Sequence, residues 1–230
     1  MKEKVKKILN KIKSFFKEAF ISPLQLIVHP ISGWEIFKQE KKAKRWVSIF
    51  YVCMMIFAVV LNEVAKGFIV GGTDLKEFNL FRTILVVLLP VLVGVIANWC
   101  VGSLFDGKGK AHEIFDAIAY SFFPYVWLSI VATIVSNFIA TDEIVYYTFI
   151  MGLGVGLTMW MMFFGIMGVH ENSFGMNIIN IVFTIIVIAV IIFTILLQLT
   201  KVYGIMYKVN TIVINPYAYR KGIHHGKKGN

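Results

Sequence analysis

The sequence predicts an all-α polytopic membrane protein, a five-transmembrane-helix bundle with an N-terminal amphipathic interfacial helix. Hydrophobic residues make up 58% of the 230 positions and charged residues 16%, which leaves too little polar surface to cover a water-soluble globule. The charges are also segregated, because 12 of the 23 Lys and Arg residues precede Val47. After that point the chain contains five long stretches that are nearly free of charge, as membrane-spanning helices require.

The first 21 residues are expected to form a basic amphipathic helix that lies in the membrane interface. Their apolar residues recur at spacings of three and four, and lysines occupy the rest of the helix surface. Phe15 and Phe16 would enter the acyl region, while Lys4, Lys7 and Lys11 would face anionic head groups. The alternative is a helix that docks on a partner or on the cytoplasmic face of this protein.

Residues 22–46 are expected to form short cytoplasmic or interfacial helices. Pro23 suits the first turn of one helix, and Pro30 ends it. A serine and a glutamate at capping-box spacing predict a second helix over residues 33–42. Trp34 on that helix would anchor at the level of the head groups.

Five uncharged stretches are the predicted spans, since crossing about 30 Å of hydrocarbon takes roughly 20 helical residues. They cover residues 47–65, 83–105, 117–140, 144–169 and 176–200. The first is the shortest, because Asn62 and Glu63 lie near its end. Residues 201–230 form a basic extension and tail, in which the fifth helix either continues with a bend near Gly204 or gives way to an interfacial helix.

The distribution of basic residues predicts a cytoplasmic N-terminus and an outer C-terminus. With that orientation the cytoplasmic side carries 14 Lys and Arg residues and the opposite side nine. The acidic turn at 141–143 agrees with this orientation, whereas the basic tail argues against it. Because the basic residues flank hydrophobic spans, the net charge of +10 indicates a bilayer with anionic head groups as partner and not nucleic acid.

Several polar residues and two prolines lie inside the predicted spans, where an unpaired polar group is costly. They are Asn98, Tyr120, Asn137, Asn177 and Asn180, with Pro90 and Pro124 as positions that favour kinks. We expect the polar groups to form hydrogen bonds between helices. The alternative is a path for a small solute or lipid between the second, third and fourth helices, lined by Asn98 and Tyr120.

Glycines in the fourth span predict close helix packing. Gly152 and Gly156 have the small-xxx-small spacing that lets two helices approach, and Gly165 and Gly168 follow on the same helix. We expect these glycines to pack within the bundle or against a partner helix, which could belong to another membrane protein or to a second copy of this chain.

The densest group of histidines and carboxylates is in two loops on the predicted cytoplasmic side. Asp106 and His112 follow the second span, and His170 and Glu171 follow the fourth. These side chains could hold a divalent cation, but their spacing matches no zinc motif, so we expect no metal and no cofactor. No nucleophile stands beside a base at motif spacing, so we expect no enzyme; an intramembrane enzyme that uses His112 and His170 is a third alternative.

Several short motifs occur in a fixed order along the chain. They are His29-Pro30 with Trp34 and Lys38, Asn98-Trp99 leading to Leu104–Gly109, Ala119-Tyr120 with Pro124-Tyr125, and Phe163–Ile166 leading to His170. Their order over residues 27–220 resembles the Yip1-domain family, in particular its bacterial members.

The resemblance implies a five-helix bundle with a cytoplasmic N-terminus. Eukaryotic relatives act in vesicle traffic with Rab GTPases, a role that does not carry over to bacteria, whereas some bacterial members are associated with solute ABC transporters. We therefore expect a non-enzymatic protein of the bacterial cell membrane, an accessory, scaffold or assembly subunit of a membrane complex such as a solute ABC transporter. A small-solute or lipid carrier is the alternative.

Overall fold

The structure is a computed structural model that describes residues 17–40, 43–71 and 78–214, with side chains up to Tyr207. Its regular elements are all helical across these residues. Five segments are long and apolar enough to cross a membrane, which confirms the all-α polytopic architecture. They are α4 (Arg45–Ala65), α5 (Leu80–Leu104), the pair α6 (Ala111–Ser121) and α7 (Phe123–Val135), α8 (Ile144–His170) and α9 (Phe174–Ile214).

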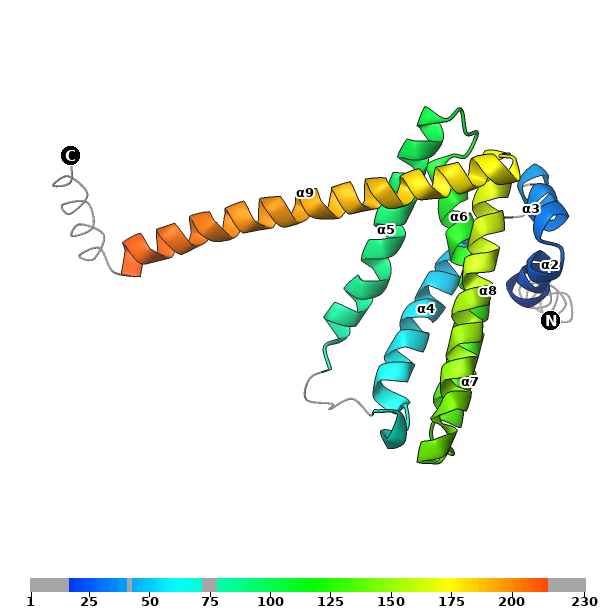
Figure 1. The fold of residues 1–230 in the computed structure, drawn as a ribbon, viewed down its shortest axis with the longest axis horizontal. Helices are drawn as coiled ribbons and strands as arrows, with labels where there is room; N and C mark the ends of the chain where they lie inside the picture. The colour runs from blue at the N-terminus through cyan, green and yellow to red at the C-terminus, as the bar shows by residue number, and fades with distance from the viewer. Residues whose placement is uncertain (1–16, 41–42, 72–77, 215–230) are drawn as a thin grey trace, which may run out of the picture. The chain divides into compact units, whose positions relative to one another are not determined.

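The chain divides into two compact units, one that ends at Thr184 and one that begins at Ile185. The first unit contains the helix bundle, in which α4, α7 and α8 pack side by side (Figure 1). The second unit begins within α9, which continues as one helix past Gly204 to Ile214. Residues 201–214, which follow the predicted fifth span, are therefore an extension of that helix.

The third span is displaced from the prediction of 117–140. It begins at Ala111 and ends at Val135, and it consists of two helices that meet at Phe122. The early start has a local cause, because the Glu113 carboxylate accepts the backbone N–H of Lys110 at 3.0 Å and caps the first turn. Pro124 lies in the first turn of α7, where a proline costs no helical hydrogen bond.

Three short helical segments precede the bundle. A π-helical turn (Lys17–Ile21) leads into α2 (Ser22–Val28) and α3 (Pro30–Gln39). The predicted start of the second helix at residue 33 is wrong, because α3 begins at Pro30 and leaves the capping-box serine inside the helix. Most of the predicted interfacial helix, with Lys4, Lys7, Lys11, Phe15 and Phe16, lies outside the described residues.

Trp34 belongs to the core and does not anchor at the membrane surface as predicted. Its side chain is 1% exposed and stacks edge-on against Phe37. Gly165 and Gly168 of α8 make room for it, since a Cβ at Gly168 would approach the Trp34 Cβ to 2.8 Å. The two glycines thus bring α3 against α8, and this contact is what buries the indole.

The bundle has two ends with different connections. We call the end where α4 and α6 begin and α5 and α8 end the His170 end, and the opposite end the Asn62 end. At the Asn62 end, Asn62 donates to Thr133 and to Tyr147, both at 3.0 Å, and Ser136 accepts the N–H of Gly67 at 2.8 Å. Neutral hydrogen bonds of this kind hold α4, α7 and α8 together there.

Candidate functional site

His170, the last residue of α8, turns into the bundle at the His170 end. Its side chain is 2% exposed, and three glycines of the α5 terminus and the loop after it enclose the imidazole. A Cβ at Gly102 or Gly107 would overlap the ring, and one at Gly109 would come within 2.9 Å of it. Because each of these positions must lack a side chain, the loop after α5 is shaped around the histidine.

Asn98 links this histidine to α9. Its Oδ1 lies 2.9 Å from His170 Nε2, and its Nδ2 donates to Asn180 Oδ1 at 2.7 Å and to Thr184 Oγ1 at 3.1 Å. All four side chains are buried. One asparagine of α5 therefore joins the end of α8 to the beginning of α9, and this network accounts for two of the predicted intramembrane polar groups.

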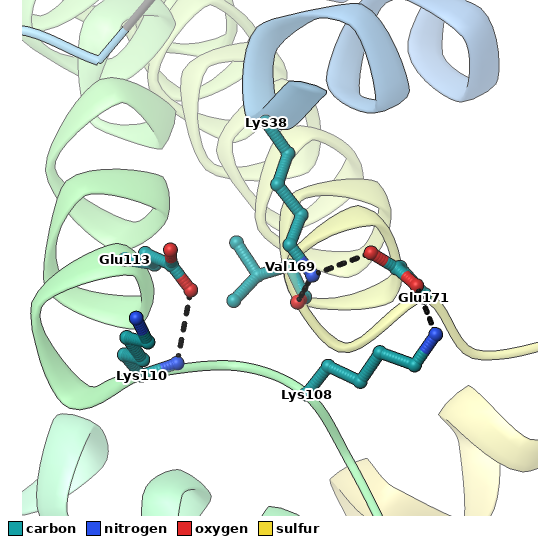
Figure 2. A network of polar contacts seen from close by, with 6 residues as sticks. All are labelled: Lys38, Lys108, Lys110, Glu113, Val169 and Glu171. Carbon is teal, nitrogen blue, oxygen red and sulfur yellow. Dashed lines mark hydrogen bonds and ion pairs between the residues drawn. The ribbon is translucent and has the colours of Figure 1, made fainter. Parts of the chain in front are cut away.

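Glu171 is the centre of an ionic cluster outside the spans (Figure 2). Its carboxylate pairs with Lys108 at 2.7 Å and with Lys38 at 3.0 Å, and Lys38 also donates to the carbonyl of Val169 at 2.6 Å. Hydrogen bonds from these two lysines lower the pKa of Glu171 from 4.5 to about 2. Lys38 thereby caps the C-terminus of α8, and the cluster ties α3 to the loop before α6.

Asp116 lies inside the third span and is buried. Its carboxylate accepts a hydrogen bond from Ser48 at 2.6 Å and faces Arg45 at 3.6 Å, so α4 neutralises the charge that α6 carries. Tyr120, one turn further along α6, accepts the backbone N–H of Lys44 at 3.4 Å and packs against Phe37. Tyr120 is therefore part of the core between α3 and α6.

A cleft of about 310 Å³ opens at the same end of the bundle, between α3, α4 and α6. We call it the α3–α4–α6 cleft. Aromatic and apolar side chains line one part of it, and ionisable side chains line the rest. The lining residues are Trp34, Phe37, Lys38, Ala43, Arg45, Lys110, His112, Glu113, Asp116 and Val169.

The other predicted positions are distributed over the bundle. Asn177 is buried and donates to the carbonyl of Phe163 at 2.9 Å, as expected of an interhelical group. Asn137 lies beyond the end of α7 and not within a span; it is exposed and bonds the carbonyl of Ala65 at 2.8 Å. Pro90 lies on the outside of α5, which continues through it.

The four predicted glycines of α8 divide into two pairs, because Gly165 and Gly168 pack against Trp34 whereas Gly152 and Gly156 face outward. A Cβ added at Gly152 or Gly156 would meet no atom of another element within 4 Å in the described structure, so contact of this pair with a partner helix stays a prediction. Gly154 packs inside the bundle instead, with its Cβ position 3.3 Å from Leu128 of α7. The reason is helical phase, because Gly154 faces α7 while its two neighbours face outward.

The structure separates the four candidate metal ligands. His170 is enclosed beside Asn98, Glu171 pairs with two lysines, Asp106 occupies a left-handed turn, and His112 lines the cleft. Among the described residues, no three His, Cys, Asp or Glu side chains are placed to share a metal ion. His112 and His170 belong to different environments, which gives no support to a shared catalytic site.

Two parts of this site were missed at the level of sequence. Lys38 was noted only as a motif residue, although it joins α3 to α8. The glycines around His170 stand at positions 102, 107 and 109, and three glycines in eight residues at the end of a span were an available signal for a close contact.

Comparison with known proteins gives a single positive result. A sequence model of the Yip1 domain matches residues 24–199, which include α2 to α8 and most of α9. No curated protein and no solved structure matches the chain.

Proposed function

The chain belongs to the Yip1 domain family, and we propose on this basis that it acts as a non-enzymatic accessory, scaffold or assembly subunit of a membrane complex. Members of the family are membrane proteins that are not known as enzymes. We place the chain in the bacterial branch and in the cell membrane, with its N-terminus in the cytoplasm. The partner we propose is a solute ABC transporter.

The observation that carries this proposal is the burial of polar groups inside the bundle, where several of them bond one another. Asn98 and Tyr120 would have lined a solute path, but each is 1% exposed and is engaged by neighbouring side chains. Asn62 at the other end is likewise bonded to Thr133 and Tyr147. Because the bundle uses these groups to hold its own helices, its interactions with other molecules are at its surfaces.

The face of α8 that carries Gly152 and Gly156 is a suitable contact for a partner helix. The two glycines are exposed, and the absence of a side chain lets another transmembrane helix approach the backbone closely. Exposed apolar residues accompany them, among them Leu153 and Val155. The partner helix would come from the transporter or, in a homo-oligomer, from a second copy of this chain.

Affinity purification of the tagged full-length chain in a mild detergent, followed by quantitative mass spectrometry, tests the proposal. We expect the membrane and nucleotide-binding subunits of a solute ABC transporter to co-purify with the wild type. Their recovery should fall several-fold for the double variant Gly152→Leu/Gly156→Leu, because the side chains would hold the partner helix away.

The matched control is Val86→Leu on α5, which changes the size of an exposed apolar side chain on a helix other than the one that carries Gly152 and Gly156. Recovery of the transporter with this control should equal that of the wild type. The proposal is overturned when no transporter subunit is enriched over a tagged, unrelated membrane protein of the same membrane.

A further inference from the structure

We propose that the α3–α4–α6 cleft binds a phosphate group, either in the head group of an anionic phospholipid or as free phosphate. Its volume of about 310 Å³ is at the lower end of the roughly 300–1,000 Å³ of small-ligand pockets. This inference goes beyond the proposed function and does not depend on the identity of any protein partner.

Positive charge gathers around the cleft from three separate elements. Lys38 comes from α3, Arg45 from the first turn of α4, and Lys110 from the residue before α6, and the imidazole of His112 lies beside them as a hydrogen-bonding group. The Lys110 and His112 side chains are exposed and have no hydrogen-bond or ion-pair partner among the described residues. These two side chains are therefore available to an incoming anion.

The two carboxylates of the cleft are already committed to its framework. Asp116 is bonded to Ser48 at 2.6 Å and faces Arg45 at 3.6 Å. Glu113 accepts the backbone N–H of Lys110 at 3.0 Å, as Figure 2 shows. Both carboxylates line the cleft, and each is engaged by the first turn of α4 or by the residue before α6.

Two helix N-termini meet at the cleft. The α4 helix begins at Arg45 and the α6 helix at Ala111, and the residue just before each of them is not helical. The first backbone N–H groups of a helix have no acceptor within it, and the helix dipole adds a partial positive charge at this end. Two such termini beside three cationic side chains form an environment that stabilises a phosphate.

Trp34 is one of the aromatic residues that line the cleft, and it is 1% exposed. Its indole offers an apolar surface to the glycerol portion of a lipid head group.

The level of the cleft in the membrane favours a lipid source. Arg45 and Ala111 begin two segments that are long and apolar enough to cross a membrane, so we expect both residues at the boundary between hydrocarbon and water. Trp46, next to Arg45, is 41% exposed, as is typical of aromatic side chains at the level of the head groups. A phospholipid in the surrounding leaflet therefore holds its phosphate at the height of these cations.

Native mass spectrometry of the full-length protein in detergent tests the lipid source, with phosphatidylglycerol and phosphatidylcholine as probes. We expect the wild type to bind phosphatidylglycerol at least about fivefold more tightly, since one cation near an anionic lipid contributes roughly that factor. The variant Lys110→Gln should lose this preference, and adding His112→Gln should weaken binding further.

Lys108→Gln is the matched control, because Lys108 lies in the same loop, carries the same charge and does not line the cleft. It should keep the wild-type preference. Calorimetric titration with inorganic phosphate alone tests the second source. If the wild type binds phosphate, Lys110→Gln abolishes that binding, and no lipid preference is seen, the cleft is assigned to free phosphate.

The inference is overturned when the wild type shows neither lipid preference nor phosphate binding. Equal affinities for the wild type, Lys110→Gln and Lys108→Gln also overturn it. Circular dichroism and the thermal transition of each variant establish that the fold is retained, as expected for changes at three exposed side chains. Because neither probe is a protein, failure here is distinct from failure of the proposed transporter association.

Discussion

The two ends of the bundle are held together by different chemistry. At the Asn62 end most of these bonds join neutral groups, Asn62 with Thr133 and Tyr147 and Gly67 with Ser136, and one carboxylate, that of Glu63, accepts a hydrogen bond from Thr83 at 2.8 Å. At the His170 end the chain brings together a buried histidine, an ionic cluster and a cleft with several cations.

This difference indicates where the molecule interacts with its surroundings. A neutral hydrogen bond can join helices in the membrane at little cost, whereas a charged group is retained at cost and needs partners. The His170 end holds exposed polar side chains that no side-chain contact among the described residues engages, including Lys110 and His112. The Asn62 end closes the bundle, and the His170 end carries the cleft that we propose as a phosphate site.

The largest expected effect is at the contact between α5 and His170. Gly102→Ala should lower the free energy of unfolding by about 2–3 kcal/mol, because its Cβ would overlap the enclosed imidazole. Denaturant titration in detergent micelles measures the change. Gly94→Ala in the same helix has open space around its Cβ position and should show no loss. Equal effects of the two variants would mean that the enclosure of His170 is not tight.

The hydrogen-bond network at the same end should give the next largest effect. Asn98→Ala removes bonds to His170, Asn180 and Thr184 and leaves buried polar atoms unpaired, which should cost about 1–2 kcal/mol. The same titration measures it, and a double-mutant cycle with Asn180→Ala should give a non-zero coupling energy. Additive effects would contradict a shared network.

At the opposite end the corresponding change should cost less. Asn62→Ala removes neutral bonds to two half-buried or buried neighbours, and about 0.6 kcal/mol is the average for such bonds in a membrane. Unfolding titrations of the two asparagine variants, measured side by side, test the comparison directly. A cost for Asn62→Ala equal to that for Asn98→Ala would remove the contrast between the two ends.

The smallest effect should come from the exposed ionic cluster and should depend on pH. The pKa of Glu171 falls to about 2 in the folded state. Its contribution to the free energy of unfolding is therefore complete above the ordinary pKa of 4.5 and is lost as pH falls toward 2. Glu171→Gln should therefore cost under about 1 kcal/mol at pH 7, since the carboxylate is exposed. Denaturant titrations of the wild type and of Glu171→Gln at pH 7 and at pH 3 measure this difference in the free energy of unfolding.

The control for this change is Glu35→Gln on α3, an exposed carboxylate with no ion pair among the described residues. Its effect on unfolding should be near zero at both pH values. A difference between wild type and Glu171→Gln that grows as pH falls would have the wrong sign for a depressed pKa and would contradict the role of Lys38 and Lys108.

Sequence reasoning located the spans well where their length and apolar composition determine the two ends of the helix. Predicted and observed bounds of the fourth span differ by one residue, 144–169 against Ile144–His170. The third span was placed six residues late, because a pattern based on apolar residues does not detect that Glu113 caps a helix containing His112 and Asp116. The polar residues of the candidate site were recognised as a group, but their individual partners were not.

Hydrophobicity by itself determined that this chain is a five-span membrane protein, because transfer of apolar helices into lipid is a property of each segment. Which face of each helix is covered, and which residues are in contact, was decided only by the tertiary structure. Trp34 has the composition of a membrane-surface anchor, but two glycines of α8 make room for it and it is buried. Gly152 and Gly156 have packing spacing but face outward, since a neighbouring helix and not the spacing decides which face is covered.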